Sequence, residues 1–154
     1  MAATSNMAPA VHDARGYAPP SIERIFYDGH CGLCQGFVRF TIARDRSGAK
    51  FRYAPLQGKT FEALVPAERR AGLPDSFVIL TNDGRLLIRS DGVIHVLRQL
   101  GGFWNFTAGV ISIFPRPIRD AVYNFVARVR YRIFGRRDNI CPVAPPKLRA
   151  RFDD

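Results

Sequence analysis

Two cysteines three residues apart, Cys31 and Cys34, are the residues of this 154-residue chain whose type and spacing best fit a chemical reaction. Paired thiols at this spacing exchange electrons with a disulfide: one thiolate attacks a substrate disulfide, and the second thiol resolves the mixed disulfide that forms. The same spacing also occurs in half of a metal site and in pairs of cysteines that only pack in a core. The secondary structure on either side of the pair is therefore needed to choose between a redox, a metal and a structural role.

The surrounding residues predict a strand before the pair and a helix after it. Residues 25–27 are an apolar run that Asp28-Gly29 ends. From Cys34 to Ile42, apolar residues recur at the spacing of one helix face, which puts Cys31 in the first turn and Cys34, more buried, on the core face. Helix N-termini stabilise a thiolate, so we predict that Cys31 is the nucleophile, with a pKa below about 8.5, and that Cys34 is the resolving thiol.

Two polar residues adjoin the thiols. Asp28, at the end of the strand, can act as the general base that deprotonates Cys34, or it can cap the helix by accepting backbone N–H bonds. His30 would stabilise the Cys31 thiolate if protonated, or it is a surface histidine without a specific role. Asp28 is predicted as catalytic with the two cysteines, and His30 as a modulator.

The third cysteine, Cys141, lies in the C-terminal tail. It is a bystander thiol, a third redox thiol or a metal ligand. A zinc site would need both motif cysteines, Cys141 and a histidine such as His95, and no second Cys-x-x-Cys accompanies them. We therefore predict no metal.

Three stretches together resemble a known family. Asp28-x-x-Cys31-x-x-Cys34, Ser90-Asp91 and the Tyr-Arg-Ile-Phe-Gly-Arg-Arg stretch at 131–137 resemble the DCC family of thiol–disulfide oxidoreductases, over about residues 22–152. The resemblance implies a thioredoxin-like fold and dithiol/disulfide activity. It implies no particular substrate.

The remaining pattern predicts an α/β fold of the order β-α-β-α-β-β-α, which is that of thioredoxin. After the first helix come a strand at 51–53, helical segments at 60–64 and 66–72, a hairpin of 76–80 with 86–88, and a helix to residue 100 that Ser90 or Asp91 caps. Thioredoxin-fold proteins usually place a cis-proline just before the third strand. Pro74 is the only candidate here, although it is offset from that place.

A helical extension is expected beyond residue 102. Residues 103–114 are apolar, and a second helix follows over 118–134, with Ile118, Val122, Phe125, Val126 and Val129 expected to face inward. Seven arginines crowd this second helix and its flanks: Arg116, Arg119, Arg128, Arg130, Arg132, Arg136 and Arg137. Either the extension covers one side of the sheet and shows a solvated basic surface, or it docks on a partner or a membrane surface.

Length and composition fit one globular domain. We predict a mobile tail over 1–21 without signal-peptide character, a thioredoxin-like core over 22–102, the extension over 103–137 packed on the core, and a tail over 138–154. No apolar run is long enough to span a membrane. The net charge of +10 favours weak attraction to polyanions, but no nucleic-acid-binding motif accompanies it.

These observations predict a thiol–disulfide oxidoreductase of the protein-disulfide reductase type. Three cysteines are too few for a secreted disulfide framework, which favours the cytoplasm. No flavin or nicotinamide fingerprint is present, so we predict no cofactor, a disulfide-containing protein or small molecule as substrate, and a cellular thiol as reductant. The alternative is a non-catalytic module that binds a protein or an anionic membrane through its arginine-rich helices. The sequence does not specify the oligomeric state.

Overall fold

The computed structural model describes residues 22–74, 77–136 and 146–153. Four strands form one mixed sheet: β1 (Glu23–Tyr27), β2 (Phe51–Pro55), β3 (Phe77–Leu80) and β4 (Leu86–Ile88). Their order is β2-β1-β3-β4, with β1 parallel to β2 and antiparallel to β3, and with β4 antiparallel to β3. This is the sheet of the predicted thioredoxin-like fold, with β1 in a central position.

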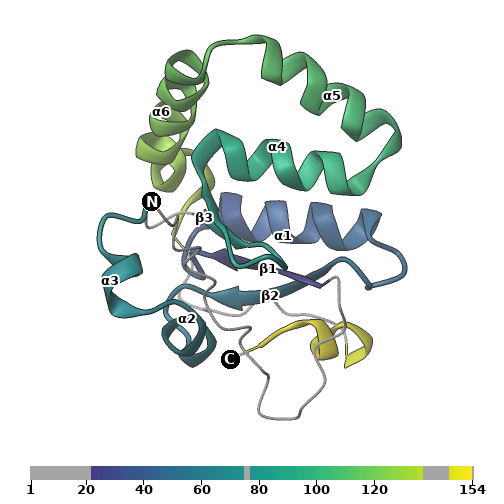
Figure 1. Cartoon of the computed structure of the whole chain (residues 1–154). Helices are drawn as coiled ribbons and strands as arrows, with labels where there is room; N and C mark the ends of the chain where they lie inside the picture. The colour runs from purple at the N-terminus through teal and green to yellow at the C-terminus, as the bar shows by residue number, and fades with distance from the viewer. Residues whose placement is uncertain (1–21, 75–76, 137–145, 154) are drawn as a thin grey trace, which may run out of the picture.

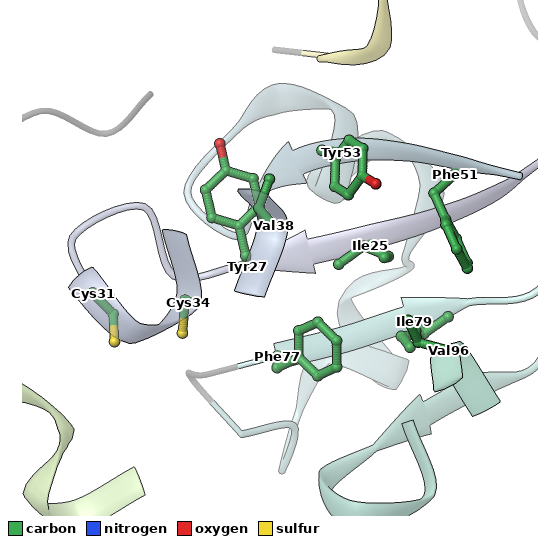
Figure 2. Packing of buried hydrophobic residues seen from close by; sticks show 10 residues of the cluster. All are labelled: Ile25, Tyr27, Cys31, Cys34, Val38, Phe51, Tyr53, Phe77, Ile79 and Val96. Atoms are coloured by element: carbon green, nitrogen blue, oxygen red, sulfur yellow. The ribbon is translucent and has the colours of Figure 1, made fainter. Parts of the chain in front are cut away.

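Successive side chains of each strand point to opposite faces of the sheet, so each strand contributes residues to both faces. On one face, α1 (Gly32–Arg44) and α4 (Arg89–Leu100) cover the sheet, and on the other face lies α2 (Lys59–Leu64), followed by α3 (Ala67–Arg70) (Figure 1). The larger core cluster lies on the α1 and α4 side and includes both motif cysteines: Ile25, Tyr27, Cys31, Cys34, Val38, Phe51, Tyr53, Phe77, Ile79 and Val96 (Figure 2). The site therefore lies at one end of the main core.

The predicted hairpin is confirmed. β3 and β4 pair from Val78 with Ile88 to Leu80 with Leu86, and Gly84 in the turn between them has a φ of +82°. A left-handed residue is what a tight hairpin turn requires, and glycine adopts it without the steric cost of a Cβ. Asp83-Gly84 was therefore a reliable signal for this part of the fold.

Two helices extend the fold beyond α4. Helix α5 (Gly102–Ile113) stacks on α4, on the side away from the sheet, and α6 (Arg116–Phe134) follows after a break at Pro115 (Figure 1). Ile94 and Leu97 of α4 form a small core with Ala108 of α5. A short 3-10 helix, η1 (Pro146–Arg151), lies beside β2. No helix in the described ranges is long and apolar enough to cross a membrane.

The inward-facing prediction for α6 was wrong for four of its five residues, whereas the fifth, Val129, is half-buried. Ile118, Val122, Phe125 and Val126 are all exposed, with Phe125 at 64%. Helix α6 contacts α1 and α4, and Arg130, one turn after Val126, is the buried residue of this helix. Polar bonds, rather than this apolar stripe, hold α6 in place.

The predicted cap of α4 was also wrong. The helix begins at Arg89, and no side chain caps its N-terminus. The Ser90 hydroxyl instead donates to the Asp120 carboxylate of α6 (2.5 Å), and Asp91 pairs with Arg116 (2.8 Å) and Arg119 (3.4 Å). Ser90-Asp91 thus attaches α6 to the core.

Candidate active site

The cysteine pair lies where β1 ends and α1 begins. The backbone N–H of Cys31 donates to the Asp28 carbonyl (3.2 Å), and Cys31, in extended conformation, is the residue that precedes the first turn of α1. Cys34 follows in that first turn. Both cysteines are reduced in this structure, with no disulfide between them, and their sulfurs point to the same side of α1 (Figure 2). The predicted placement at the helix N-terminus is confirmed.

The two thiols have opposite pKa shifts. A hydrogen bond from the Cys34 thiol lowers the pKa of Cys31 to about 6, and the backbone N–H groups of Cys34 and Leu33 and the charge of Arg130 lower it further, against the effect of burial. The same hydrogen bond, together with burial, raises the pKa of Cys34. One thiolate next to one protonated thiol is the arrangement that a dithiol exchange reaction needs.

A buried polar cluster around Asp28 lies below the thiols. One carboxylate oxygen accepts hydrogen bonds from the His30 backbone N–H (3.0 Å) and the Gln57 side chain (3.3 Å). The other accepts from the Arg130 guanidinium (3.4 Å) and from the Tyr131 hydroxyl. The side chains of Asp28 and Arg130 are only 3% and 4% exposed, so their charges compensate each other away from water.

Sequence reasoning did not predict this cluster, because Arg130 is 102 residues from Asp28 and was interpreted as part of a solvated basic surface. The residue that could have indicated this cluster is Tyr131, which begins the family-like stretch at 131–137. The alternative role of Asp28 as a helix cap is not observed, since no side chain caps α1 and the carboxylate accepts the N–H of His30, before the helix.

The end of α6 covers Cys31. Cys31 forms an isolated bridge with Arg136, and the N–H of Gly32 donates to the Gly135 carbonyl (3.4 Å). A Cβ at Gly32 would lie 2.5 Å from the Phe134 carbonyl oxygen, so only glycine permits this approach. As a result Cys31 has no exposed surface, and Cys34 is 7% exposed, so both thiols are buried. Residues 134–136 are called the cap below.

An apolar groove of about 540 Å³ lies beside the pair, between α1, α4, α5 and α6. Its volume is in the range of small-molecule sites in proteins. The residues that line it include Cys34, Phe37, Phe77, Val93, Val122 and Arg130. The groove therefore gives direct access to the Cys34 side of the pair.

The other predicted residues have less to do with the site. Pro74 precedes β3, but no cis peptide bond occurs in the described ranges, so it is not the cis-proline expected near the thiols. His30 adjoins Cys31 and contributes its backbone N–H to the Asp28 cluster. Cys141, the predicted tail at 1–21 and residues 138–145 of the predicted tail at 138–154 lie outside the described residues, whereas Pro146–Arg151 of that second tail form η1. Within those residues, no three His, Cys, Asp or Glu side chains are grouped so that they could hold a metal ion.

A thioredoxin-like fold with a free, oppositely shifted thiol pair at the start of its first helix defines a thiol–disulfide exchange protein by class. Comparison with protein families agrees, since a family model described as DCC1-like thiol-disulfide oxidoreductase matches residues 25–136. The chain belongs to this family, and the resemblance in its sequence is confirmed. No solved structure matches the chain significantly.

Two relatives show how widely the sequence is shared. The Bacillus subtilis (strain 168) protein named "Uncharacterized protein YuxK" is 37% identical over 132 residues, which cover 83% of this chain and 91% of that protein. The Arabidopsis thaliana protein named "DCC family protein At1g52590, chloroplastic" is 31% identical over 115 residues, covering 75% of this chain and 66% of that protein. Neither name states a substrate.

Proposed function

We propose that this protein reduces disulfides with Cys31 as nucleophile and Cys34 as resolving thiol. The opposite pKa shifts of the two thiols carry this proposal, since at neutral pH they leave Cys31 ionised and Cys34 protonated. The Cys31 thiolate attacks one sulfur of the substrate disulfide, and the other sulfur leaves and takes up a proton. Cys34 then loses its proton, attacks Cys31 and releases the second substrate thiol, so that two electrons pass to the substrate.

The oxidised Cys31–Cys34 pair then needs an external reductant. A cellular dithiol, or two molecules of a monothiol such as glutathione, restores both thiols by the same exchange chemistry. A reducing compartment such as the cytoplasm fits this direction of electron flow, as does a chain with only three cysteines. The substrate is a disulfide in a protein or a small molecule, and the groove beside Cys34 offers it an apolar surface.

Asp28 acts in this proposal mainly as a positioning residue. A carboxylate has about four acceptor sites, and four donors of the described chain already occupy those of Asp28. To serve as a general base for Cys34, it would have to exchange one of these donors for the thiol. Its direct effect is to hold Arg130, whose charge lowers the pKa of both cysteines.

The cap must move during the reaction, because Cys31 has no exposed surface from which to attack a disulfide. In the described residues, the backbone contact that holds the cap on α1 is a long hydrogen bond of 3.4 Å from the Gly32 N–H to the Gly135 carbonyl, which belongs to the isolated bridge between Cys31 and Arg136. Gly135, with a φ of +74°, lies between the end of α6 and Arg136. Displacement of these few residues would expose the thiolate without unfolding α6.

The experiment is turnover of a disulfide probe with a thiol reductant, followed for the reduced wild-type protein and two variants. Cys31→Ser is expected to abolish turnover, and Cys34→Ser is expected to stop it after one attack and to accumulate a mixed disulfide, visible as a mass increase on Cys31. Cys141→Ser serves as the matched control and should retain full turnover. Unchanged turnover in Cys31→Ser would reject the proposal, and would favour a non-catalytic binding module.

A further inference from the structure

Helix α5 exposes an apolar face that nothing in the described chain covers. The side facing α4 carries Trp104, Ala108 and Ile111. The opposite side carries Phe103, Phe106, Val110 and Ile113, of which Phe103, Phe106 and Ile113 are 69%, 68% and 78% exposed. Their spacing of three, four and three residues puts them on one face, about 15 Å long. A helix that is apolar all round normally lies inside a protein core or in lipid.

Helix α6 adds a second apolar stripe, bordered by positive charge. Every large hydrophobic residue that is mostly exposed in the described chain lies between residues 103 and 134. On α6 these residues include Ile118, Val122, Phe125 and Ile133, which follow one another at helical spacing. Arg128 and Arg132 are exposed and fall beside Phe125 on the helical wheel. Ordinary soluble surfaces do not gather their apolar residues in this way.

The charge of the extension is strongly one-sided. Residues 102–136 contain six arginines and one acidic residue, Asp120. Asp120 is already engaged, since it accepts the Ser90 hydroxyl and lies 3.7 Å from Arg116. A second copy of the chain, docking through the same surface, would bring arginines against arginines, and like charges oppose such a contact. An anionic surface with an apolar interior complements both features.

We propose that the exposed faces of α5 and α6 dock this protein on an anionic membrane surface. Helix α5 has 12 residues, about 18 Å, which is too short to cross a bilayer but suited to lie along its interface. Phenylalanine and aliphatic side chains enter the boundary of the acyl chains, and the arginine stems let their charged ends reach the headgroups. This inference goes beyond the proposed disulfide reduction, because it uses no thiol.

The residues for the test must be separate from the groove and from the thiol site. Ile118, Val122 and Val126 line the groove beside Cys34, so their substitution would affect both. Phe103 and Phe106 are absent from the groove lining and are largely exposed, so Phe103→Ser/Phe106→Ser should fold normally. Arg128→Gln/Arg132→Gln tests the charge. The control is Lys147→Gln/Arg149→Gln, which removes two exposed charges on η1, far from α5 (Figure 1).

The assay is flotation of the full-length reduced protein with vesicles of phosphatidylcholine alone or mixed with phosphatidylglycerol. We expect binding to the anionic vesicles, weakened by salt. Phe103→Ser/Phe106→Ser should weaken it at least about tenfold, and Arg128→Gln/Arg132→Gln about thirtyfold, since each arginine near an anionic surface contributes about a factor of five. A Cys31→Ser/Cys34→Ser variant should bind like the wild type.

Three outcomes would overturn the proposal. The first is no binding to anionic vesicles at low salt. The second is an equal loss in the η1 control, which would show attraction by net charge alone. The third is a concentration-dependent dimer, measured by light scattering, that the two phenylalanine substitutions dissociate while vesicle binding stays unchanged; this would assign the apolar face to a second copy of the chain.

Discussion

Removing the positive charge of Arg130 should destabilise the protein by several kcal/mol. Arg130→Met keeps much of the side-chain volume but leaves the Asp28 carboxylate, only 3% exposed, without its cation. Breaking a buried ion pair by removing one partner typically costs about 3–5 kcal/mol, because the remaining charge is left uncompensated. The hydrogen bonds that Asp28 accepts from Gln57 and Tyr131 remain, so we expect the lower half of that range, about 3–4 kcal/mol.

The assay is urea unfolding of the reduced protein, with the exposed pair of Arg85 and Asp83 as the control. That pair is shorter, at 2.7 Å against 3.4 Å, but its side chains are 65% and 53% exposed. Arg85→Met should therefore cost less than about 1 kcal/mol, because water screens an exposed pair. Burial, rather than distance, is the variable that this comparison tests.

A double-mutant cycle then isolates the pair. Asp28→Asn leaves Arg130 buried without its anion and should also be costly, whereas Asp28→Asn/Arg130→Met should cost clearly less than the sum of the single variants. The reasoning would be refuted if Arg130→Met unfolded at the same urea concentration as the wild type, or if the two substitutions were additive.

Three further predictions concern the thiols and the cap. Gly32→Ala places a methyl group against the Phe134 carbonyl and should loosen the cap, so that iodoacetamide modifies Cys31 faster; Gly36→Ala, on the same helix with open space around it, should leave this rate unchanged. Cys34→Ala removes the hydrogen bond that contributes most to the low pKa of Cys31, so the midpoint of the pH dependence of Cys31 alkylation should rise; an unchanged midpoint would mean that this hydrogen bond does not set the pKa. The pKa of Cys31 is about 6 in the folded protein and about 8.5 in an unfolded chain, so between these pH values the unfolded state binds one more proton than the folded state. The unfolding free energy of the reduced protein should therefore rise with pH across this window. The contribution of Cys31 to stability should be lost as the pH falls through about 6. Urea midpoints of the wild type and Cys31→Ser at pH values across the window would measure that slope, and parallel curves would contradict it.

The sequence predicted the parts of this fold that short-range chemistry determines. The strand and helix around Cys31, the β3–β4 hairpin at Asp83-Gly84 and the order of the elements all follow from spacing within about 15 residues. The opposite shifts of the two thiol pKa values agree with the predicted roles, although their main cause is the hydrogen bond between the two thiols, which the sequence argument did not use.

Contacts between distant segments could not be predicted in this way. The stripe of α6 that contains Phe125 has the periodicity of a buried face, yet it is exposed, since periodicity shows that a helix has an apolar side but not what covers it. Arg130, one turn after Val126 on α6, looked like a solvated arginine until its partner, Asp28, was known. The burial of Cys31 depends on the cap, whose approach is visible only in three dimensions.

The central claim is that Cys31 is a thiolate at neutral pH and Cys34 is not. The most direct measurement is the ultraviolet absorbance of thiolate during a pH titration of the reduced protein, compared between a Cys141→Ser background and the same background with Cys31→Ser. This absorbance does not require a reagent to reach Cys31 beneath the cap. We predict a single transition near pH 6 that Cys31→Ser removes. A first transition near the ordinary thiol value of about 8.5, or one that survives Cys31→Ser, would contradict the assignment of Cys31 as the nucleophile.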